Sequence, residues 1–395
     1  MLKKVLTLFI LFFSCSIIFA QSDLNLPDLN FTGNGARSAA MGYAFTGLAD
    51  DATAISWNPA GLAQLYSMEA SVVGRFGSTS IDFSGVDNPP VWERSSSFQL
   101  NFASFVFPFN VGSINIVGGV AYKILYDWNE EEKYKWGSFL VPLGFPNGYT
   151  ETLTSDGGVS AISPSLGIEI NEMISVGTTV NIIMGSNTYK YKDNEGFSFK
   201  SEEEEYSGVG VDIGVLIKPN DILNIGANLN LPYDIDYTTD TDEGTLDVPF
   251  FFSVGAAAHV TDEFTLAFDY QNRAWSNSDL IKDAIQEYFD LEGVAEKNID
   301  VDLNSIHVGM EYLLGAGNII IPLRAGYYNN PIFQWDNNLN QIVNNVFTFG
   351  AGLVMDKIII DSAVEIENMT LEYDTYTQEE TSLRFTIGTT IHFGD

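Results

Sequence analysis

The sequence has few of the residues that carry catalysis and metal binding. It contains one cysteine, Cys15, and three histidines. Because Cys15 falls in the first 20 residues, the rest of the chain can form neither a disulfide nor a thiolate metal site. HExxH pairs, EF-hand loops and glycine-rich phosphate loops with a lysine are all missing. The pattern predicts no catalytic residue, no metal site and no cofactor, and it indicates that the chain is not an enzyme.

Basic residues are few as well. The chain has 18 Lys and Arg against 52 Asp and Glu, which gives a formal net charge of −34. A surface of this sign repels the phosphates of nucleic acid, so no nucleic-acid partner is expected. The acids gather in predicted loops, where they form either a solvated rim or divalent-cation contacts with lipopolysaccharide. The acidic clusters are 130–132, 202–205, 240–243 and 379–380.

Long apolar runs are also missing after residue 20. No later stretch offers the roughly 18 consecutive apolar residues of a transmembrane helix. Residues 1–20 carry Lys3 and Lys4, then an apolar run, then Ala20 before a polar Gln21, which is the order of a secretory signal peptide. The chain is therefore expected to be exported, and any crossing of a membrane must be made by strands.

What the chain has in abundance is alternation of apolar and polar residues. From Tyr66 onward about fourteen segments alternate, each near the roughly 10 residues that a tilted transmembrane strand needs. An even number of strands is the rule for bacterial outer-membrane barrels. The sequence predicts an all-β fold, a transmembrane antiparallel β-barrel. The segments are approximately 66–77, 96–108, 111–126, 159–170, 173–190, 205–218, 222–237, 247–260, 263–275, 301–314, 318–328, 345–355, 358–373 and 381–393.

The connections between these segments alternate in length. Long ones cover 127–158, 191–204, 238–246, 276–300 and 329–344. The short ones contain the usual turn residues and fall at Pro108-Phe109-Asn110, Asn171-Glu172, Pro219-Asn220-Asp221, Thr261-Asp262, Gly315-Ala316-Gly317 and Asp356-Lys357. In outer-membrane barrels the short turns face the periplasm and the long loops face the exterior. The predicted location is the outer membrane of a Gram-negative cell.

Strand parity assigns side chains to the lipid or to the lumen. In 381–393, Phe385 and Ile387 point to one face and Arg384 to the other; in 318–328, Arg324 opposes Leu323. Because Arg or Lys on the lipid face costs about 2–4 kcal/mol at the bilayer midplane, the charges are expected to face the lumen. There they predict ion pairs that hold an interior segment to the wall, or a site for the anionic head group of a ligand.

Residues 33–65 differ from everything that follows them. The stretch is rich in Gly and Ala, poor in charge and interrupted by Asn58-Pro59, with neither a strand period nor a long helical one. A compact non-strand segment ahead of a barrel is most simply a plug inside it. The predicted domains are a signal peptide at 1–20, a plug or hatch at 21–65 and the barrel at 66–395.

The same stretch resembles the N-terminal signature of the FadL/TodX family of outer-membrane transporters for hydrophobic compounds. The matching residues are Gly35-Ala36-Arg37, Met41-Gly42, Ala49-Asp50-Asp51-Ala52 and Asn58-Pro59-Ala60-Gly61. The PorV/PorQ-like barrels linked to type IX secretion carry a similar segment. The first resemblance implies passive uptake of long-chain fatty acids or other hydrophobic compounds. The second implies a barrel that hands cargo to a secretion machine.

The resemblance also implies where a ligand would be handled. The tetrapeptide from Asn58 to Gly61 would be a hatch motif beside an inward kink of the third strand, where a lateral exit opens. Gly118 and Gly119 lie in that strand and are the candidate kink, although glycines packed against a plug would give the same pattern. The expected pocket residues are Arg37, Met41, Phe45 and Trp57.

Two predicted loops carry much apolar surface. Residues 127–158 contain Trp128 and Trp136, and residues 277–297 place Leu280 and Ile281 at the start of a helical pattern behind Ser278. The second loop predicts a short amphipathic helix with a serine cap, which is either a lid on the loops beneath or a surface that captures an amphiphile.

The expected partners are outer-membrane lipid, lipopolysaccharide and a hydrophobic small molecule, with the barrel as a monomer. The secretion alternative adds a protein partner. A structural barrel with a permanently closed plug is the third alternative.

Overall fold

The computed structural model describes residues 33–85, 90–96, 98–112, 114–136, 147–201, 203–282, 301–335, 340–372 and 377–393. The predicted signal peptide lies outside these residues, as do 21–32 and most of the predicted helix at 277–297. In the described part of the chain, no helix has the length and apolarity needed to cross a membrane.

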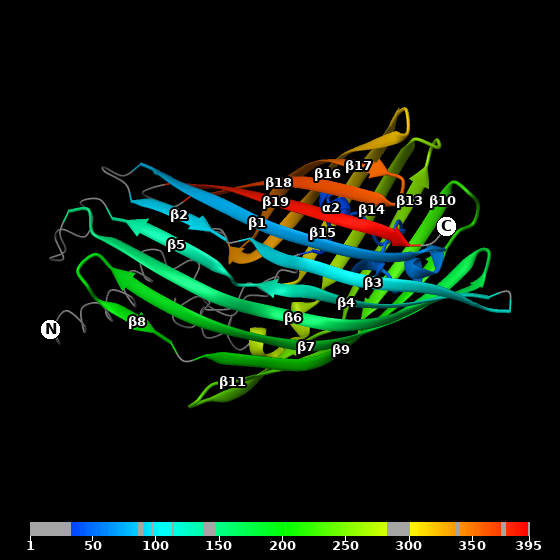
Figure 1. Cartoon of the computed structure of the whole chain (residues 1–395). Coiled ribbons are helices and arrows are strands. Elements are labelled where there is room, and N and C mark those ends of the chain that lie inside the picture. The colour runs from blue at the N-terminus through cyan, green and yellow to red at the C-terminus, as the bar shows by residue number, and fades with distance from the viewer. Residues whose placement is uncertain are drawn as a thin grey trace.

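Fourteen antiparallel strands form a closed barrel (Figure 1). Each strand pairs with the next in the wall, and the last pairs with the first over the whole of Met68–Ser84, which closes the ring. The wall strands are β1 (Met68–Ser84), β3 (Gln99–Val111), β4 (Ile114–Asp127), β6 (Thr150–Asn171), β7 (Ile174–Asp193), β9 (Glu204–Ile217), β10 (Leu223–Asn230), β13 (Phe251–His259), β14 (Phe264–Arg273), β15 (Leu303–Ala316), β16 (Ile319–Trp335), β17 (Gln341–Met355), β18 (Ile358–Glu372) and β19 (Thr377–Phe393). The predicted fold class is confirmed.

Five short strands lengthen the barrel at the end that carries the long connections. They are β2 (Val91–Ser95), β5 (Glu130–Lys135), β8 (Ser198–Lys200), β11 (Tyr233–Thr238) and β12 (Glu243–Val248). Much of what the sequence predicted as long loops is therefore strand. The predicted segments 222–237 and 247–260 are each divided, at Pro232 and Pro249, because proline cannot donate a ladder hydrogen bond.

One predicted turn is wrong. Pro108, Phe109 and Asn110 continue β3 and pair with Val117, Ile116 and Asn115 of β4. The chain reverses instead just beyond Val111, where Gly112 adopts a φ of 65°. The alternation of outward phenylalanines extends to Phe109, and this apolar face outweighed the turn preference of a lone proline. The turn at Asp356-Lys357 lies where it was predicted.

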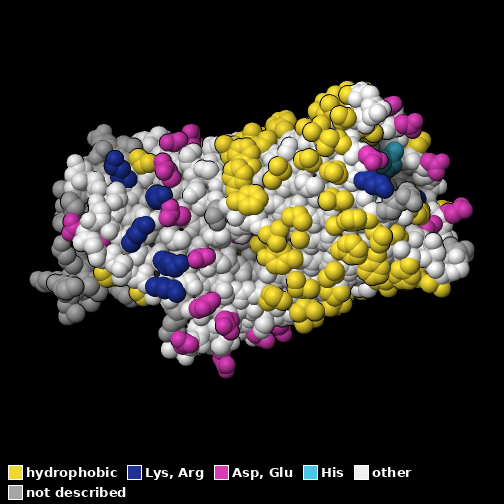
Figure 2. Space-filling view, viewed as in Figure 1, with side chains coloured by type: hydrophobic (Ala, Val, Ile, Leu, Met, Phe, Trp, Pro, Cys, Tyr) yellow, Lys and Arg dark blue, Asp and Glu magenta, His cyan; other side chains and the backbone are white. Residues whose placement is uncertain are grey.

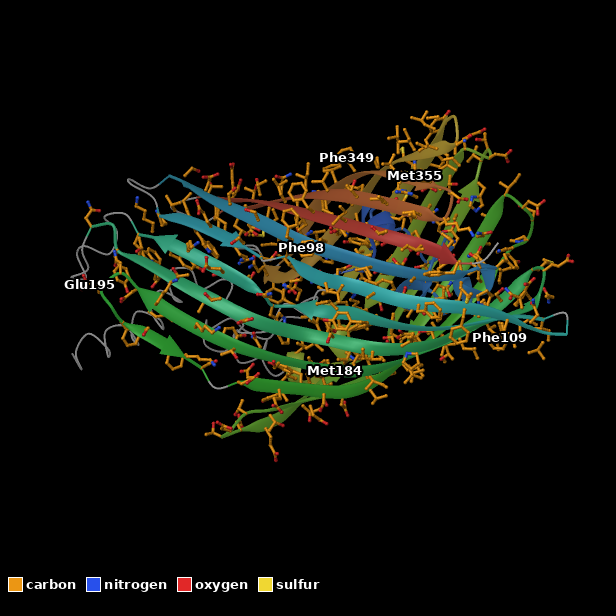
Figure 3. The ribbon with its side chains drawn as sticks, viewed as in Figure 1. Phe98, Phe109, Met184, Glu195, Phe349 and Met355 are labelled. Carbon is orange, nitrogen blue, oxygen red and sulfur yellow. The ribbon has the colours of Figure 1, made fainter. Side chains whose placement is uncertain are left out.

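The outer surface carries a band of apolar side chains over the half nearer the short turns (Figure 2). Ile306, Val308 and Met310 alternate outward along β15, whereas His307 and Glu311 of the same strand are buried. Phe98 just before β3, Met184 of β7 and Phe349 of β17 are exposed on the outside of the barrel (Figure 3). This alternation confirms the parity assignment, and the band is the surface that a bilayer would cover.

The charges that parity assigned to the interior form ion pairs there. Lys123 Nζ lies 3.5 Å from Asp212 Oδ2, and Arg75 Nη2 lies 3.2 Å from Glu365 Oε2. Arg324 bridges Glu311 and Asp361, with both contacts at 2.6 Å. These groups are largely withdrawn from water, so losing one partner would leave an uncompensated buried charge.

Residues 33–65 pack against the inner side of this wall. They contain two short helices, α2 (Ala36–Ala40) and α3 (Ala54–Trp57), a 3-10 turn η1 (Pro59–Gln64) and irregular chain between them. Irregular chain leaves backbone N–H and C=O groups without helix or strand hydrogen bonds. When these groups are buried, they need hydrogen-bond partners elsewhere in the protein. Wall side chains supply them: Thr348 to Ala40 O, His307 to Gly42 O, Asp269 to the N–H groups of Phe45 and Thr46, Thr179 to Ile55 O, and Asn115 to Ala63 O.

Glycines let the wall approach the backbone of this segment closely. A Cβ added at Gly177 would fall on the backbone of Pro59, and one at Gly326 would fall on the backbone of Gly42. The glycines with such contacts come from seven wall strands around the barrel. They are Gly167, Gly177, Gly214, Gly226, Gly309, Gly326 and Gly350.

We predict that Gly326→Ala lowers the stability of the folded barrel by about 1–3 kcal/mol, because the added methyl group must displace backbone rather than a flexible side chain. Gly315→Ala is the matched control, since nothing lies within 4 Å of its added Cβ. The measurement is the temperature at which each purified barrel loses its compact mobility in a denaturing gel. Equal temperatures for the two variants would contradict the close fit.

Candidate functional site

The predicted hatch motif joins the N-terminal segment to the wall. Asn58 is fully buried, and its Nδ2 donates to Thr46 O at 2.9 Å and to Val215 O of β9 at 3.0 Å. Its Oδ1 accepts from Ala60 N at 3.2 Å, and Pro59 opens the 3-10 turn that contains Ala60 and Gly61. The motif thus closes its own turn and ties that turn to β9.

Two of the four expected pocket residues are packed rather than open to a cavity. Met41 and Phe45 are fully buried in a cluster with Leu48, Trp57 and Ala257. Arg37 is held by carboxylates: Asp50 Oδ1 lies 2.6 Å and Glu311 Oε1 2.9 Å from the guanidinium. Glu311 belongs to the wall, so this contact is one of the predicted ion pairs that hold the segment in place.

Trp57 is the expected pocket residue that borders a cavity. The cavity has a volume of about 80 Å³ and lies between α3 and the wall. Its charged lining residues are Lys123, Asp212 and Arg273, and its aromatic ones include Tyr126, Tyr233 and Phe251. Asn228 Oδ1, also on this lining, is buried and accepts no hydrogen bond from the described residues. A bound donor at this place would satisfy it.

An apolar cluster lies next to this cavity, toward the end of the barrel with the long connections. Leu125 and Tyr126 belong both to the cluster and to the cavity lining. The apolar cluster also contains Trp128, Trp275 and Trp335, each no more than 8% exposed. The described interior therefore passes from an aromatic, apolar region to a small, polar one.

The wall is interrupted beside the cavity, between the second and third wall strands. β3 and β4 pair only as far as Phe102↔Lys123, and pairing resumes between β2 and β5 at Ser95↔Glu131. No register pair joins the described residues of 96–101 to 124–130. Leu125 and Tyr126 lie in this unpaired stretch, so the cavity borders the gap in the ladder.

The first described residues of the N-terminal segment occupy this interruption. Asn34 Nδ2 donates to Ile124 O at 3.3 Å, which satisfies a carbonyl that the missing ladder leaves open. Asn101 donates to Gly33 O and accepts from Gly35 N. Trp57 Nε1 donates to Asn34 O at 2.9 Å. Residues 33–35 thus lie between the cavity and the interrupted wall.

Gly118 and Gly119 do not interrupt the ladder. They pair in continuous register with β3 on one side and with β6 on the other, and the register shift in β4 falls between Ile124 and Tyr126. A Cβ at Gly119 would meet Ile55 Cδ1 at 3.1 Å, so this glycine packs against the N-terminal segment. A glycine keeps both backbone hydrogen-bonding groups, which is why the ladder runs through it undisturbed.

Sequence reasoning missed the polar lining of the cavity. Asn181, Asn228, Asn230 and Gln271 come from β7, β10 and β14 and face the lumen. Strand parity would have placed these side chains in the lumen. Whether they lie at the same height along the barrel axis depends on how far neighbouring strands are shifted along one another. In the described part of the chain, no group of three His, Cys, Asp or Glu side chains could hold a metal ion.

The predicted serine cap at the end with the long connections is confirmed where the structure describes it. Ser278 Oγ accepts from Ile281 N at 3.3 Å. Asp247 in β12 accepts from Ser278 Oγ and from the N–H groups of Asp279 and Leu280. Partial burial alone would raise the pKa of Asp247, but these donors hold the pKa below its ordinary value.

The wall and its buried N-terminal segment define the fold class of the protein: a closed antiparallel β-barrel of fourteen strands. Solved structures of this class share the fold. The toluene transporter TodX of P. putida is 13% identical, with 93% of this chain and 100% of that chain covered and a TM-score of 0.64.

The toluene transporter TbuX of Ralstonia pickettii is 15% identical over 92% of this chain and 100% of that chain, with a TM-score of 0.60. The monoaromatic hydrocarbon channel CymD is 14% identical over 93% and 99%, with a TM-score of 0.55. The predicted resemblance to TodX-type barrels is thereby confirmed at the level of the fold, and these neighbours are transporters and channels rather than enzymes. No family model and no curated protein matches the sequence.

We predict that Asp247→Asn increases amide hydrogen exchange of Asp279 and Leu280 by about fivefold at neutral pH, the scale of losing one helix cap. Because the pKa of Asp247 is lowered in the folded protein, the stabilisation that its carboxylate gives to this turn is complete at neutral pH. That stabilisation is lost as the pH falls through the lowered pKa. Asp279→Asn is the control, since that carboxylate is 90% exposed and pairs with Lys282. Similar exchange in both variants would rule out the anchor.

Proposed function

We propose that the protein is an outer-membrane transporter for passive uptake of hydrophobic compounds, with long-chain fatty acids as the favoured class. The observation that carries the proposal is the position of the polar cavity, between an apolar aromatic cluster and an interruption of the barrel wall. The fold shared with transporters of toluene supports it. No energy source is needed, because an apolar molecule gains about 25 cal/mol per Å² on leaving water.

The proposed route begins at the exterior end, which we assign to the long connections. A ligand enters the aromatic cluster around Trp128, Trp275 and Trp335 and reaches the cavity beside Trp57. It leaves sideways between β3 and β4, where the ladder is interrupted, rather than at Gly118 and Gly119. This lateral route keeps an apolar molecule out of water throughout.

Residues 21–65 act as the hatch in this proposal, and within the described part of that range only residues 33–35 need to move. The part from Met41 to Gly61 is in close contact with wall glycines, so shifting it would open many contacts at once. Residues 33–35 are held instead by the side chains of Asn34, Asn101 and Trp57. Breaking those few hydrogen bonds would open the interruption to the cavity.

The cavity lining favours a ligand with a polar head over a pure hydrocarbon. Arg273 offers positive charge, whereas Lys123 is paired with Asp212, and the buried Asn228 Oδ1 would accept from a donor such as the hydroxyl of a protonated carboxyl group. A volume of about 80 Å³ suits a head group, while the alkyl chain would extend into the aromatic cluster. The carboxyl group of a fatty acid beside Arg273 is the arrangement that this chemistry supports.

We further propose that the barrel acts as a monomer in the lipid of a Gram-negative outer membrane, with lipopolysaccharide around its outer leaflet. The apolar band of Figure 2 fits that environment. A secretion shuttle remains the alternative function, and the first experiment below separates it from the transporter.

Native mass spectrometry of the protein purified from its own outer membrane in mild detergent is the first test. We expect a bound fatty acid, and we expect Arg273→Gln and Trp57→Ala to lower its occupancy by about tenfold, the scale of one charge-assisted contact. Tyr312→Phe on the lipid face is the control and should retain the ligand. An empty barrel that carries a secreted protein would favour the shuttle instead.

The lateral exit has its own test. Gln99 Nε2 lies 2.8 Å from Asp127 Oδ1 across the interruption, so Gln99→Cys with Asp127→Cys allows a short thiol cross-linker to span it. We expect cross-linking to abolish uptake of a labelled fatty acid into cells while leaving ligand binding intact. The uncross-linked double variant and the cross-linker-treated native chain are controls. Unchanged uptake after complete cross-linking would refute the lateral route.

A further inference from the structure

Lysines are few in this acidic chain, and several of them gather on one outward face. Five of the chain's 18 basic residues lie on β5, β7 and β8, at the end with the long connections. They are Lys133, Lys135, Lys190, Lys192 and Lys200, and all are exposed. Figure 2 shows Lys and Arg side chains in a row at this end, separated from the apolar band.

The strand register places these lysines side by side. Lys133 pairs with Thr152, which pairs with Lys192, so Thr152 lies between two lysines in one row across three strands. One row nearer the apolar band, Thr154 pairs with Lys190, which pairs with Lys200. Neighbouring strands lie about 4.8 Å apart, so Lys133 and Lys192 have Cα atoms about 10 Å apart, a span that a sugar phosphate can bridge.

These side chains point away from the barrel. Lys190 and Lys192 share the parity of Ile182 and Met184, which are exposed on the apolar band of β7. Lys190 is six residues beyond Met184 along the strand. At about 3.3 Å per residue and a tilt of about 40°, it lies about 15 Å above the band, at the level of lipid sugars rather than of acyl chains.

The face has unused positive charge. Lys133 pairs with Glu131 at 2.6 Å and Lys190 with Asp156 at 3.0 Å. Lys135, Lys192 and Lys200 make no ion pair with any other described residue. The exposed acids beside these lysines are Glu93 of β2, opposite Lys133, and Asp156 of β6. Strands elsewhere at this end expose acids without such a group of lysines, among them Asp82, Asp236 and Glu379.

We propose that this lysine–threonine face of β5–β8 binds the phosphorylated sugars of an outer-leaflet glycolipid. The inference rests on the proposed outer-membrane location and is independent of transport. It assigns the lipopolysaccharide contact to lysines and hydroxyls on one side of the barrel, in place of cations bridged to the acidic clusters. Anionic sugars would then gather on one side of the barrel and be repelled from the acidic sides.

The test is binding of the full-length protein, in mild detergent, to immobilised lipopolysaccharide that is either phosphorylated or chemically dephosphorylated. The triple variant Lys133→Gln, Lys135→Gln and Lys192→Gln is expected to bind the phosphorylated form at least about tenfold more weakly, since each lysine near an anionic surface contributes to the attraction. Dephosphorylation should weaken binding of the native chain to a similar extent.

The control variant Lys218→Gln with Lys357→Gln removes lysines near the short turns, at the opposite end, and should bind as the native chain does. Equal binding of the triple variant and the native chain, or binding that ignores dephosphorylation, would overturn the proposal. A dimer that forms only with the five lysines intact would also overturn it in favour of a contact between copies. Fatty-acid uptake by the triple variant should be unchanged, so failure here leaves the transport proposal standing.

Discussion

The irregular backbone buried inside the barrel is the constraint on which the rest of the structure depends. Without strand or long helical pairing of its own, residues 33–65 would leave polar groups without partners, and each such group costs about 1–3 kcal/mol. Side chains of the wall supply the missing hydrogen bonds, and glycines of the wall allow the two backbones to approach closely. The side chains are those of Asp269, His307, Thr348, Asn115 and Thr179. The composition of the inner wall follows from what it encloses.

Most of the barrel could be predicted because its signals are local. Alternation along β15 and β19 assigns Met310 and Phe385 to the lipid and Glu311 and Arg384 to the lumen without any knowledge of neighbours. The same locality explains the errors. Pro108 was predicted to be a turn because its turn preference was weighed above the alternating Phe105, Phe107 and Phe109 on either side of it. Pro232 and Pro249 divide strands that alternation alone joins.

The candidate site was less predictable because it depends on how far neighbouring strands are shifted along one another in the closed barrel. Asn181, Asn228 and Gln271 are inward residues of three strands, and only the register of the closed barrel brings them to one level with Trp57. No residue pattern in the sequence indicates where the ladder between β3 and β4 is interrupted. The pair Gly118-Gly119 does stand out in the sequence, yet the ladder runs through it without a break. In the structure, Arg37 and Asn58 make contacts that hold the N-terminal segment to itself and to the wall.

The way the ring closes has a consequence for assembly. All 17 residues of β1 pair with β19, so the ring is closed between the described strands nearest the two ends of the chain. The N-terminal segment directly precedes β1 and fits too closely among glycines from seven strands to be inserted afterwards. We therefore expect this segment to lie in the lumen before the barrel closes, with the wall folding around it.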